Sequence, residues 1–167
     1  EKDWFISSYP KSSKFIKPFI GGNDFLKGIE RYCLWIDDDK IEEAKLIEPI
    51  NDRIKKCKEY RLNGGRDAKK AAKVPHRFFY RKYKYENSIV LPFTSSENRE
   101  YMPIGFKEPG VVISNGLFVI YDSNPFIFSV LTSKLHFFWT KVVSGKLETR
   151  IRYSVNLTYN NFPFPNI

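Results

Sequence analysis

The sequence predicts a single α+β domain over residues 1–167, with a mixed sheet, packed helices and a basic helical insertion. Hydrophobic residues make up 42% of the chain, which supplies enough apolar side chain for a buried core at this length. Segments of helical periodicity alternate with segments rich in β-branched and aromatic residues. Positive charge gathers in residues 50–86, here called the basic stretch, and this sets it apart as an insertion.

The basic stretch and the residues before it predict helices. From Lys40 to Leu62 we expect two helices, because Pro49 suits the first turn of the second. The run Asn63-Gly64-Gly65 predicts the end of that helix. A further basic helix is expected from Arg66 to Lys73, and Pro75 stops it.

The second half of the chain predicts strands around one long helix. The expected strands are residues 88–93, 101–106, 111–121 and 150–157. Residues 126–143 are mostly apolar and predict a buried helix, which Ser144-Gly145 ends. Five apolar residues near helical spacing support that helix: Phe128, Leu131, Leu135, Phe138 and Val142.

The net charge of +9 indicates a polyanionic partner. The basic stretch contains 13 Lys and Arg and four Asp and Glu. The difference of nine equals the net positive charge of the whole chain. Aromatic residues between Phe78 and Tyr85 alternate with these cations, as in surfaces that bind phosphates and stack on bases. Composition does not choose between DNA and RNA, and a solvated helix face is the alternative.

The sequence argues against a membrane-spanning protein and against a secreted one. No apolar run reaches the length of a membrane span, and the opening Glu1-Lys2-Asp3-Trp4 is not a signal peptide. Cys33 and Cys57 have no second pair with which to bind metal, so we expect reduced thiols in a cytoplasmic protein, with a disulfide between the two as the alternative. Both ends of the chain indicate excision from a longer polypeptide.

The sequence contains no catalytic constellation. Gly21-Gly22 and Gly64-Gly65 are isolated turn pairs and not phosphate-binding loops. His136 lies on the predicted apolar helix and is expected in the core. The acids Asp37 to Asp39, followed by Glu43-Ala44-Lys45, superficially suggest a metal-dependent nuclease, but they are too close in sequence and predict an acidic surface.

Three segments together resemble one family. They read FIKPFIGGNDFLKGIERYCLWI near the start, TSSENREYMPIGF in the middle and LTSKLHFFWTKVVSGKLETRIRYSVNLTYNNFPFP at the end. In this order and spacing they resemble the target recognition domain of MmeI-like type IIG restriction–modification enzymes, which are bacterial. The resemblance runs from about Phe15 to Pro165, and the basic stretch carries less of it.

The resemblance implies a fragment that reads duplex DNA and has no catalysis of its own. It implies a parent polypeptide with an adenine DNA methyltransferase in cis that uses S-adenosylmethionine, and with a nuclease that uses magnesium for cleavage. No cofactor is expected in this fragment. The alternative function is an RNA-binding module that uses the aromatic residues from Phe78 to Tyr85.

The resemblance also implies the residues that read bases. They are Glu148, Thr149, Arg150 and Arg152 in one stretch and Asn115 with Gly116 in another. Glu148 and Arg150 are two residues apart and point the same way on a strand or an extended loop, so a carboxylate and a guanidinium can read one C·G pair. A surface ion pair is the alternative for Glu148 with Arg150, and an ordinary turn is the alternative for Asn115.

Polar and basic residues are expected to contact the DNA backbone. Ser95, Ser96, Asn98 and Arg99 are expected in a loop near phosphate, with an ordinary polar turn as the alternative. Lys55, Lys69 and Lys70 are expected to contact phosphate from the basic helices.

Overall fold

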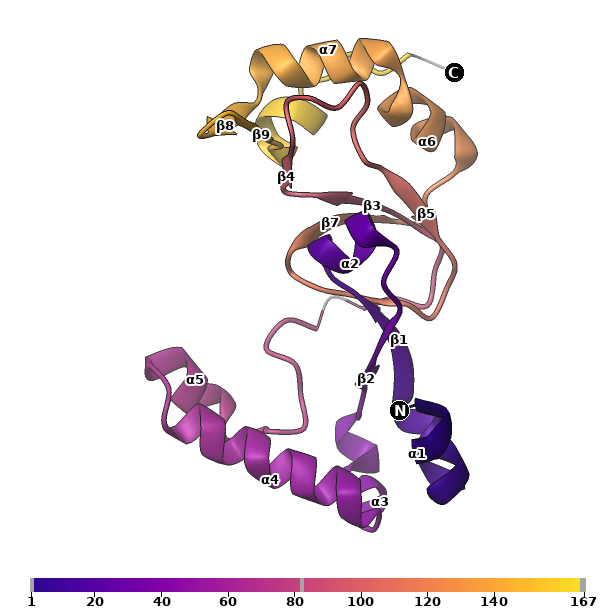
Figure 1. The fold of residues 1–167 in the computed structure, drawn as a ribbon, viewed down its shortest axis with the longest axis vertical. Helices are drawn as coiled ribbons and strands as arrows, with labels where there is room; N and C mark the ends of the chain where they lie inside the picture. The colour runs from indigo at the N-terminus through magenta and orange to yellow at the C-terminus, as the bar shows by residue number, and fades with distance from the viewer. Residues whose placement is uncertain (1, 82, 166–167) are drawn as a thin grey trace. The chain divides into compact units, whose positions relative to one another are not determined.

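The computed structural model describes residues 2–81 and 83–165, so Lys82 of the basic stretch lies outside the described residues (Figure 1). The chain forms two compact units. Unit 1 comprises Glu1–Phe19 and Arg31–Tyr83, and unit 2 comprises Ile20–Glu30 and Lys84–Ile167. Each unit has hydrophobic clusters of its own.

Unit 1 is mostly helical. Its elements are α1 (Lys2–Ser8), η1 (Pro10–Phe15), β1 (Ile16–Ile20, ending in unit 2), β2 (Arg31–Leu34), η2 (Asp38–Lys40), α3 (Ile41–Lys45), α4 (Glu48–Leu62) and α5 (Arg66–Ala71). β1 pairs antiparallel with β2, from Ile16 opposite Leu34 to Phe19 opposite Arg31. The core of the unit gathers Phe5, Phe15, Ile36, Ala44, Ile47, Ile50 and Ile54.

The helical insertion confirms the sequence prediction. Pro49 stands in the first turn of α4, where its missing N–H has no helical partner to lose. Ile50 and Ile54, four residues apart, are buried on one face, and Asn63 caps the end. α5 begins at Arg66 as predicted and ends at Ala71, two residues earlier than expected.

Unit 2 combines small antiparallel sheets with helices. Its elements are α2 (Gly22–Lys27), β3 (Ser88–Pro92), β4 (Thr94–Ser95), β5 (Gly105–Lys107), β6 (Val112–Ile113), β7 (Leu117–Tyr121), α6 (Pro125–Thr132), α7 (Lys134–Val143), β8 (Gly145–Leu147), β9 (Arg150–Arg152) and η3 (Val155–Tyr159). One sheet has the order β5-β3-β7 and another the order β4-β9-β8. The α+β class is confirmed.

β3 is the central strand of its sheet, and all five of its residues are buried. Leu91 packs with Met102 and Phe137, whereas Val90 packs with Ile20 and Leu117. Neighbouring residues of a strand point to opposite faces, so each face of β3 meets a core. This explains why the residues from Ile89 to Leu91 are all apolar and do not alternate with polar ones.

Three predicted strands are corrected. The expected strand 111–121 is two strands, β6 and β7, joined by a turn at residues 114–116. The expected strand 101–106 is extended only at residues 105–107. The expected strand 150–157 ends at Arg152, and Ser154 then caps a helical turn by accepting a hydrogen bond from the Leu157 N–H.

The predicted long helix 126–143 is also corrected. Ser133 breaks it into α6 and α7, and its extended backbone allows its side chain to cap α7. The break changes the phase of the second helix, so the buried face of α7 carries His136, Phe137 and Thr140. Leu135, Phe138 and Val142 were expected inside and are exposed.

No helix in the described parts of the chain is long and apolar enough to cross a membrane.

Candidate nucleic-acid interface

The predicted base-reading residues Glu148 to Arg152 lie on the hairpin formed by β8 and β9, here called the reading hairpin. Leu147 pairs with Arg150, which leaves Glu148 and Thr149 as a two-residue turn. Arg150 and Arg152 are exposed while Ile151 between them is buried, so the predicted common face of the two arginines is present. Glu148 differs from expectation, because it lies at the turn with a φ of 57° and not on a strand.

Glu148 and Arg150 contact each other across that turn. Arg150 Nη2 donates to Glu148 Oε2 at 2.8 Å, and both side chains remain largely open to solvent. A single contact leaves most guanidinium N–H groups and the second carboxylate oxygen available. The surface ion pair, which was the alternative to base reading, is therefore present. It holds the Glu148 carboxylate, a hydrogen-bond acceptor, beside the Arg150 guanidinium, a hydrogen-bond donor.

A polar loop leaves the sheet beside the reading hairpin. Thr94 pairs with Arg152 and Ser95 with Ile151, so residues 96–99 leave β4 at the level of Arg150. In this loop the Asn98 N–H donates to Ser96 Oγ at 3.3 Å. Such a hydrogen bond is typical of the ordinary polar turn that was the alternative to phosphate contact. Ser96, Asn98 and Arg99 are exposed.

The structure does not support the predicted contact of Ser95 with the DNA backbone. Its side chain is buried, because it lies opposite the buried Ile151 on the inner face of β4. Its hydroxyl finds no partner among the described residues. A phosphate has no access to it in this conformation, so we leave Ser95 out of the proposed interface.

Asn115 and Gly116 form the turn between β6 and β7. The Leu117 N–H donates to the Ser114 carbonyl at 3.2 Å, and the Gly116 N–H donates to Ser114 Oγ at 3.2 Å. Both turn residues are exposed. A Cβ on Gly116 would meet only ordinary contacts, with Ser114 Oγ at 3.5 Å as the nearest, so the turn does not itself require glycine there.

Strand register brings the two predicted base-reading stretches close together. Leu117 lies opposite Pro92, and Arg152 lies opposite Thr94, which is two residues further along the chain. Two residues span at most about 7 Å and each strand spacing adds about 5 Å, so the backbones of Leu117 and Arg152 are within about 17 Å. At roughly 3.4 Å per base pair, that is the length of about five base pairs.

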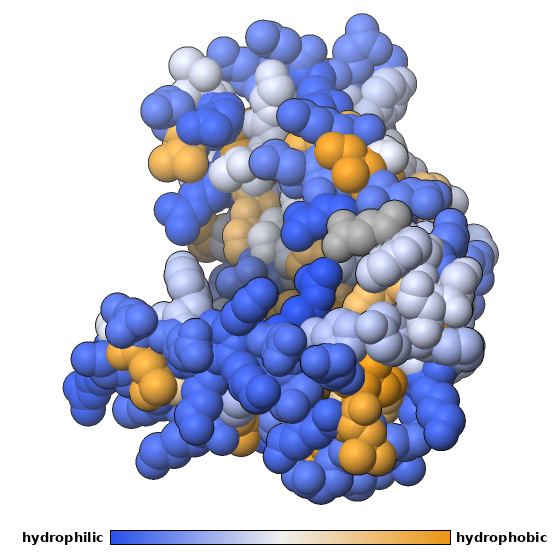
Figure 2. All heavy atoms as spheres, turned by 60° about the horizontal axis from the view of Figure 1, so that its bottom comes forward, coloured by the Kyte–Doolittle hydropathy of each residue, from blue (hydrophilic) through white to orange (hydrophobic). Residues whose placement is uncertain are grey.

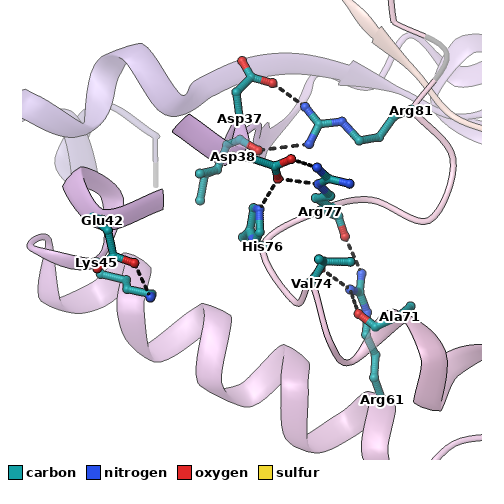
Figure 3. Close-up of polar contacts among 11 residues, drawn as sticks. Asp37, Asp38, Glu42, Lys45, Arg61, Ala71, Val74, His76, Arg77 and Arg81 are labelled. Atoms are coloured by element: carbon teal, nitrogen blue, oxygen red, sulfur yellow. Dashed lines mark hydrogen bonds and ion pairs between the residues drawn. The ribbon is translucent and has the colours of Figure 1, made fainter. Parts of the chain in front are cut away.

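Two groups of cations can be distinguished in the basic stretch, and the first makes its contacts inside unit 1 (Figure 3). Arg61 donates to three backbone carbonyls, those of Ala71, Val74 and Arg77. Arg77 and His76 contact the Asp38 carboxylate, with His76 Nε2 at 2.8 Å from Oδ1. Arg81 pairs with Asp37, donates to the Ile36 carbonyl at 3.1 Å and lies 4.5 Å from the Trp35 ring. The acidic run before the basic stretch therefore neutralises its far end.

The second group of cations lies on exposed helix faces. Lys69 and Lys70 are exposed on α5. Lys55 is exposed on α4 and lies 3.6 Å from the Asp52 carboxylate. On the face shown in Figure 2, hydrophilic residues dominate and hydrophobic ones form small separate patches.

The aromatic residues of the basic stretch mostly anchor it. Phe78 stacks on both Phe19 and Trp35 at 5.9 Å, and Tyr83 contacts Trp35 at 5.0 Å. Phe79 and Tyr80 contact each other at 5.0 Å and are exposed. The sequence does not separate anchoring from exposed aromatic residues, because their spacing follows no regular element.

The residues considered for other chemistry have structural partners. Glu43 pairs with Lys14, while Lys45 pairs with Glu42 at 2.7 Å. His136 is buried, its Nδ1 2.9 Å from the Leu131 carbonyl and its Nε2 3.1 Å from the Tyr153 hydroxyl. Burial raises the pKa of the Cys33 thiol to about 11, and both cysteines are free. Residues 2–81 and 83–165 contain no group of three or more His, Cys, Asp or Glu able to hold a metal ion.

Comparisons with known proteins place this geometry in context. A model of the MmeI target recognition domain matches residues 1–166. DNA methyltransferase A of Bacillus subtilis (strain 168) is 38% identical over 163 residues, which is 97% of this chain and 18% of that protein. The solved structure of the type IIL restriction–modification enzyme MmeI in complex with DNA matches with a TM-score of 0.89 at 38% identity. That match covers 99% of this chain and 22% of the solved chain, so the chain spans about a fifth of either relative.

Proposed function

Because the chain belongs to the MmeI target recognition domain family, we propose that it reads a duplex DNA sequence on behalf of a methyltransferase in the same polypeptide. The observation that carries the proposal is the reading hairpin. It presents an exposed carboxylate and an exposed guanidinium 2.8 Å apart at one end of the sheet β4-β9-β8. We take residues 1–167 as one recognition domain made of the two units.

The chemistry of the reading hairpin fits one C·G base pair. A carboxylate accepts from cytosine N4, and a guanidinium donates two bonds to guanine O6 and N7. Glu148 and Arg150 supply these groups, and Arg152 presents a second guanidinium from the same face of β9. Thr149 lies in the turn and contributes its hydroxyl or its backbone.

Asn115 and its neighbour Gly116 form the second reading point, in the turn between β6 and β7. An asparagine amide can bond to adenine N6 and N7 together. Gly116 lets the backbone approach a groove without a side chain in the way. The span of at most about 17 Å between this turn and β9 allows both to read base pairs within one site of about five base pairs.

Backbone contacts fix the register of such a domain on duplex DNA. The loop of Ser96, Asn98 and Arg99 leaves the sheet beside Arg150, so it suits a phosphate next to the base that Arg150 reads. Lys55 lies on the helical insertion and suits a phosphate elsewhere, but its nearby Asp52 reduces its contribution.

The complete polypeptide is proposed to be an adenine DNA methyltransferase with endonuclease activity, in the bacterial cytoplasm. The relatives are a DNA methyltransferase and a restriction–modification enzyme, each about five times the length of this chain. S-adenosylmethionine would supply the methyl group and magnesium would assist cleavage. No residue of this chain is assigned to either group, and the role of this chain is recognition.

The test exchanges the charges of the reading pair in the complete polypeptide. We expect Glu148→Lys with Arg150→Asp to change the methylated sequence at one position, measured by sequencing modified bases in cells. Lys146→Gln is the matched control, because it changes charge on the same hairpin at a residue not assigned to a base. A doubly exchanged protein that methylates the original sequence would overturn the assignment.

A further inference from the structure

The outer face of α5 and the turn after it carry four cations in one stripe. Arg66, Lys69, Lys70 and Lys73 stand at positions i, i+3, i+4 and i+7, which share one face of a helix. The Lys73 N–H donates to the Lys70 carbonyl at 3.3 Å, which continues the helical turn beyond Ala71. Ala68 and Ala72 face the interior, and Ala72 is only 3% exposed. These four residues are here called the cation stripe.

The cation stripe is not neutralised within the described part of the chain. Its four members are exposed, and none has an ion pair with a described carboxylate, in contrast to Arg77 and Arg81. Like charges three and four residues apart on a helix repel each other and destabilise it. The stripe contains four such pairs, two of them within α5 and two that include Lys73 in the turn after it, and a bound polyanion would reduce their repulsion.

The rest of unit 1 fixes the position of the stripe. Arg61 of α4 donates to the Ala71 and Val74 carbonyls at 3.0 and 3.1 Å, at the end of α5. At the start of α5 the turn is tight, since a Cβ on Gly64 would lie 2.8 Å from Ala68 Cβ. The end of α5 is therefore held to α4 by Arg61, and its start follows α4 after a tight turn.

We propose that the cation stripe binds successive phosphates along one strand of duplex DNA, independently of base sequence. The proposal rests on the proposed function and adds a second contact surface, in the unit that does not contain the base-reading residues. Seven helical steps of 1.5 Å give a stripe of about 10 Å, and at roughly 3.4 Å per nucleotide this matches two or three phosphates.

The experiment measures binding of the complete polypeptide to a random-sequence duplex as salt rises. Lys69→Gln with Lys70→Gln removes about two phosphate contacts, so the slope of log affinity against log salt should fall by about 1.8. Between 0.05 and 0.2 M salt, wild-type affinity should then drop roughly 12-fold more than that of the variant. The matched control is Lys11→Gln with Lys45→Gln, the same charge change in the same unit, and its slope should equal wild type. Equal slopes for both double variants would overturn the proposal.

Competition and methylation sequencing complete the test. Duplex DNA should compete better than single-stranded RNA of equal length or vesicles containing phosphatidylserine. Stripe-dependent preference for the RNA or the vesicles would overturn the proposal. The stripe variant should methylate the wild-type sequence less often, because sequence is read in unit 2. A changed sequence would contradict the stripe proposal, whereas an unchanged sequence in the Glu148 and Arg150 exchange would contradict base reading alone.

Discussion

Arg150 Nη2 lies 2.8 Å from Glu148 Oε2 across the turn that joins β8 to β9. Both side chains are largely exposed, and such pairs contribute only about 0.2–1 kcal/mol to folding. We therefore expect Glu148→Ala, Arg150→Ala and the double variant to unfold within about 1 kcal/mol of wild type in urea. Each single variant should nevertheless weaken methylation of the wild-type sequence. A loss of several kcal/mol in urea would show that the pair is structural.

Glu148 has a φ of 57°, which residues with a Cβ adopt at a cost. Glu148→Gly should raise the free energy of unfolding by up to about 1 kcal/mol, which is a Tm increase of roughly 2–4 °C, and should impair recognition. Thr149→Gly is the matched control, because Thr149 has no positive φ, and it should lower Tm. A lower Tm for Glu148→Gly would contradict the prediction.

Arg61 should stabilise the helical insertion through its three carbonyl contacts. A lysine carries the same charge but lacks the planar fork, so Arg61→Lys should cost about 2–3 kcal/mol. In the Arg61→Lys variant, hydrogen exchange of the backbone amides should accelerate at residues 71–77 in particular. Arg66→Lys, on the exposed face of the next helix, should change stability by less than about 0.5 kcal/mol. Equal effects of the two variants would refute this role for Arg61.

Gly105 of β5 lies directly under the Phe25 ring of α2. A Cβ at Gly105 would lie 2.5 Å from Phe25 Cε2, so Gly105→Ala should cost about 1–3 kcal/mol. Thermal unfolding measures this loss. Phe25→Leu in the Gly105→Ala background should recover part of it, because leucine leaves room for the methyl group. Failure of the second change to recover any stability would mean that the contact is not responsible.

His136 should make stability depend on pH. Burial lowers its pKa from the ordinary 6.5, so below pH 6.5 the unfolded state binds the proton more readily. Stability should fall as pH falls from 6.5 towards the folded pKa, and Tm should drop between pH 7 and 5.5. Burial also lowers the pKa of His76, so His76→Gln separates the two contributions. Nitrogen NMR should show a neutral His136 ring with its proton on Nδ1 at pH 7, and a charged ring there would contradict the assignment.

The sequence predicted elements best where local chemistry decides them. Pro49 marks the start of α4, and the run beginning at Asn63 marks its end, because these effects lie within one helical turn. Predictions failed where a single residue interrupts a long apolar segment. Ser133 divides the predicted helix 126–143 and so leaves Phe138 outside. The spacing of apolar residues over 126–143 fits one continuous helix, so it does not reveal the break at Ser133.

The candidate site was predicted in part. The residues of the reading hairpin came from a family resemblance, and the common exposed face of Arg150 and Arg152 followed from strand alternation. The positive φ of Glu148 and the burial of Ser95 did not follow, since a turn type and a strand face depend on register with another strand. The register also brings Leu117 and Arg152 close, although 35 positions separate them in the sequence.

The sequence by itself determined the α+β class, the basic insertion and, through the family, recognition as the function. Local propensity, composition and motif order need no knowledge of distant contacts. Only the tertiary structure decided which cations are free. Asp37 and Asp38 neutralise Arg81 and Arg77 across about 40 positions, whereas no carboxylate in the described part of the chain forms an ion pair with the cation stripe. Charge counts are additive along a chain, but neutralisation depends on distance in space, and folding sets that distance.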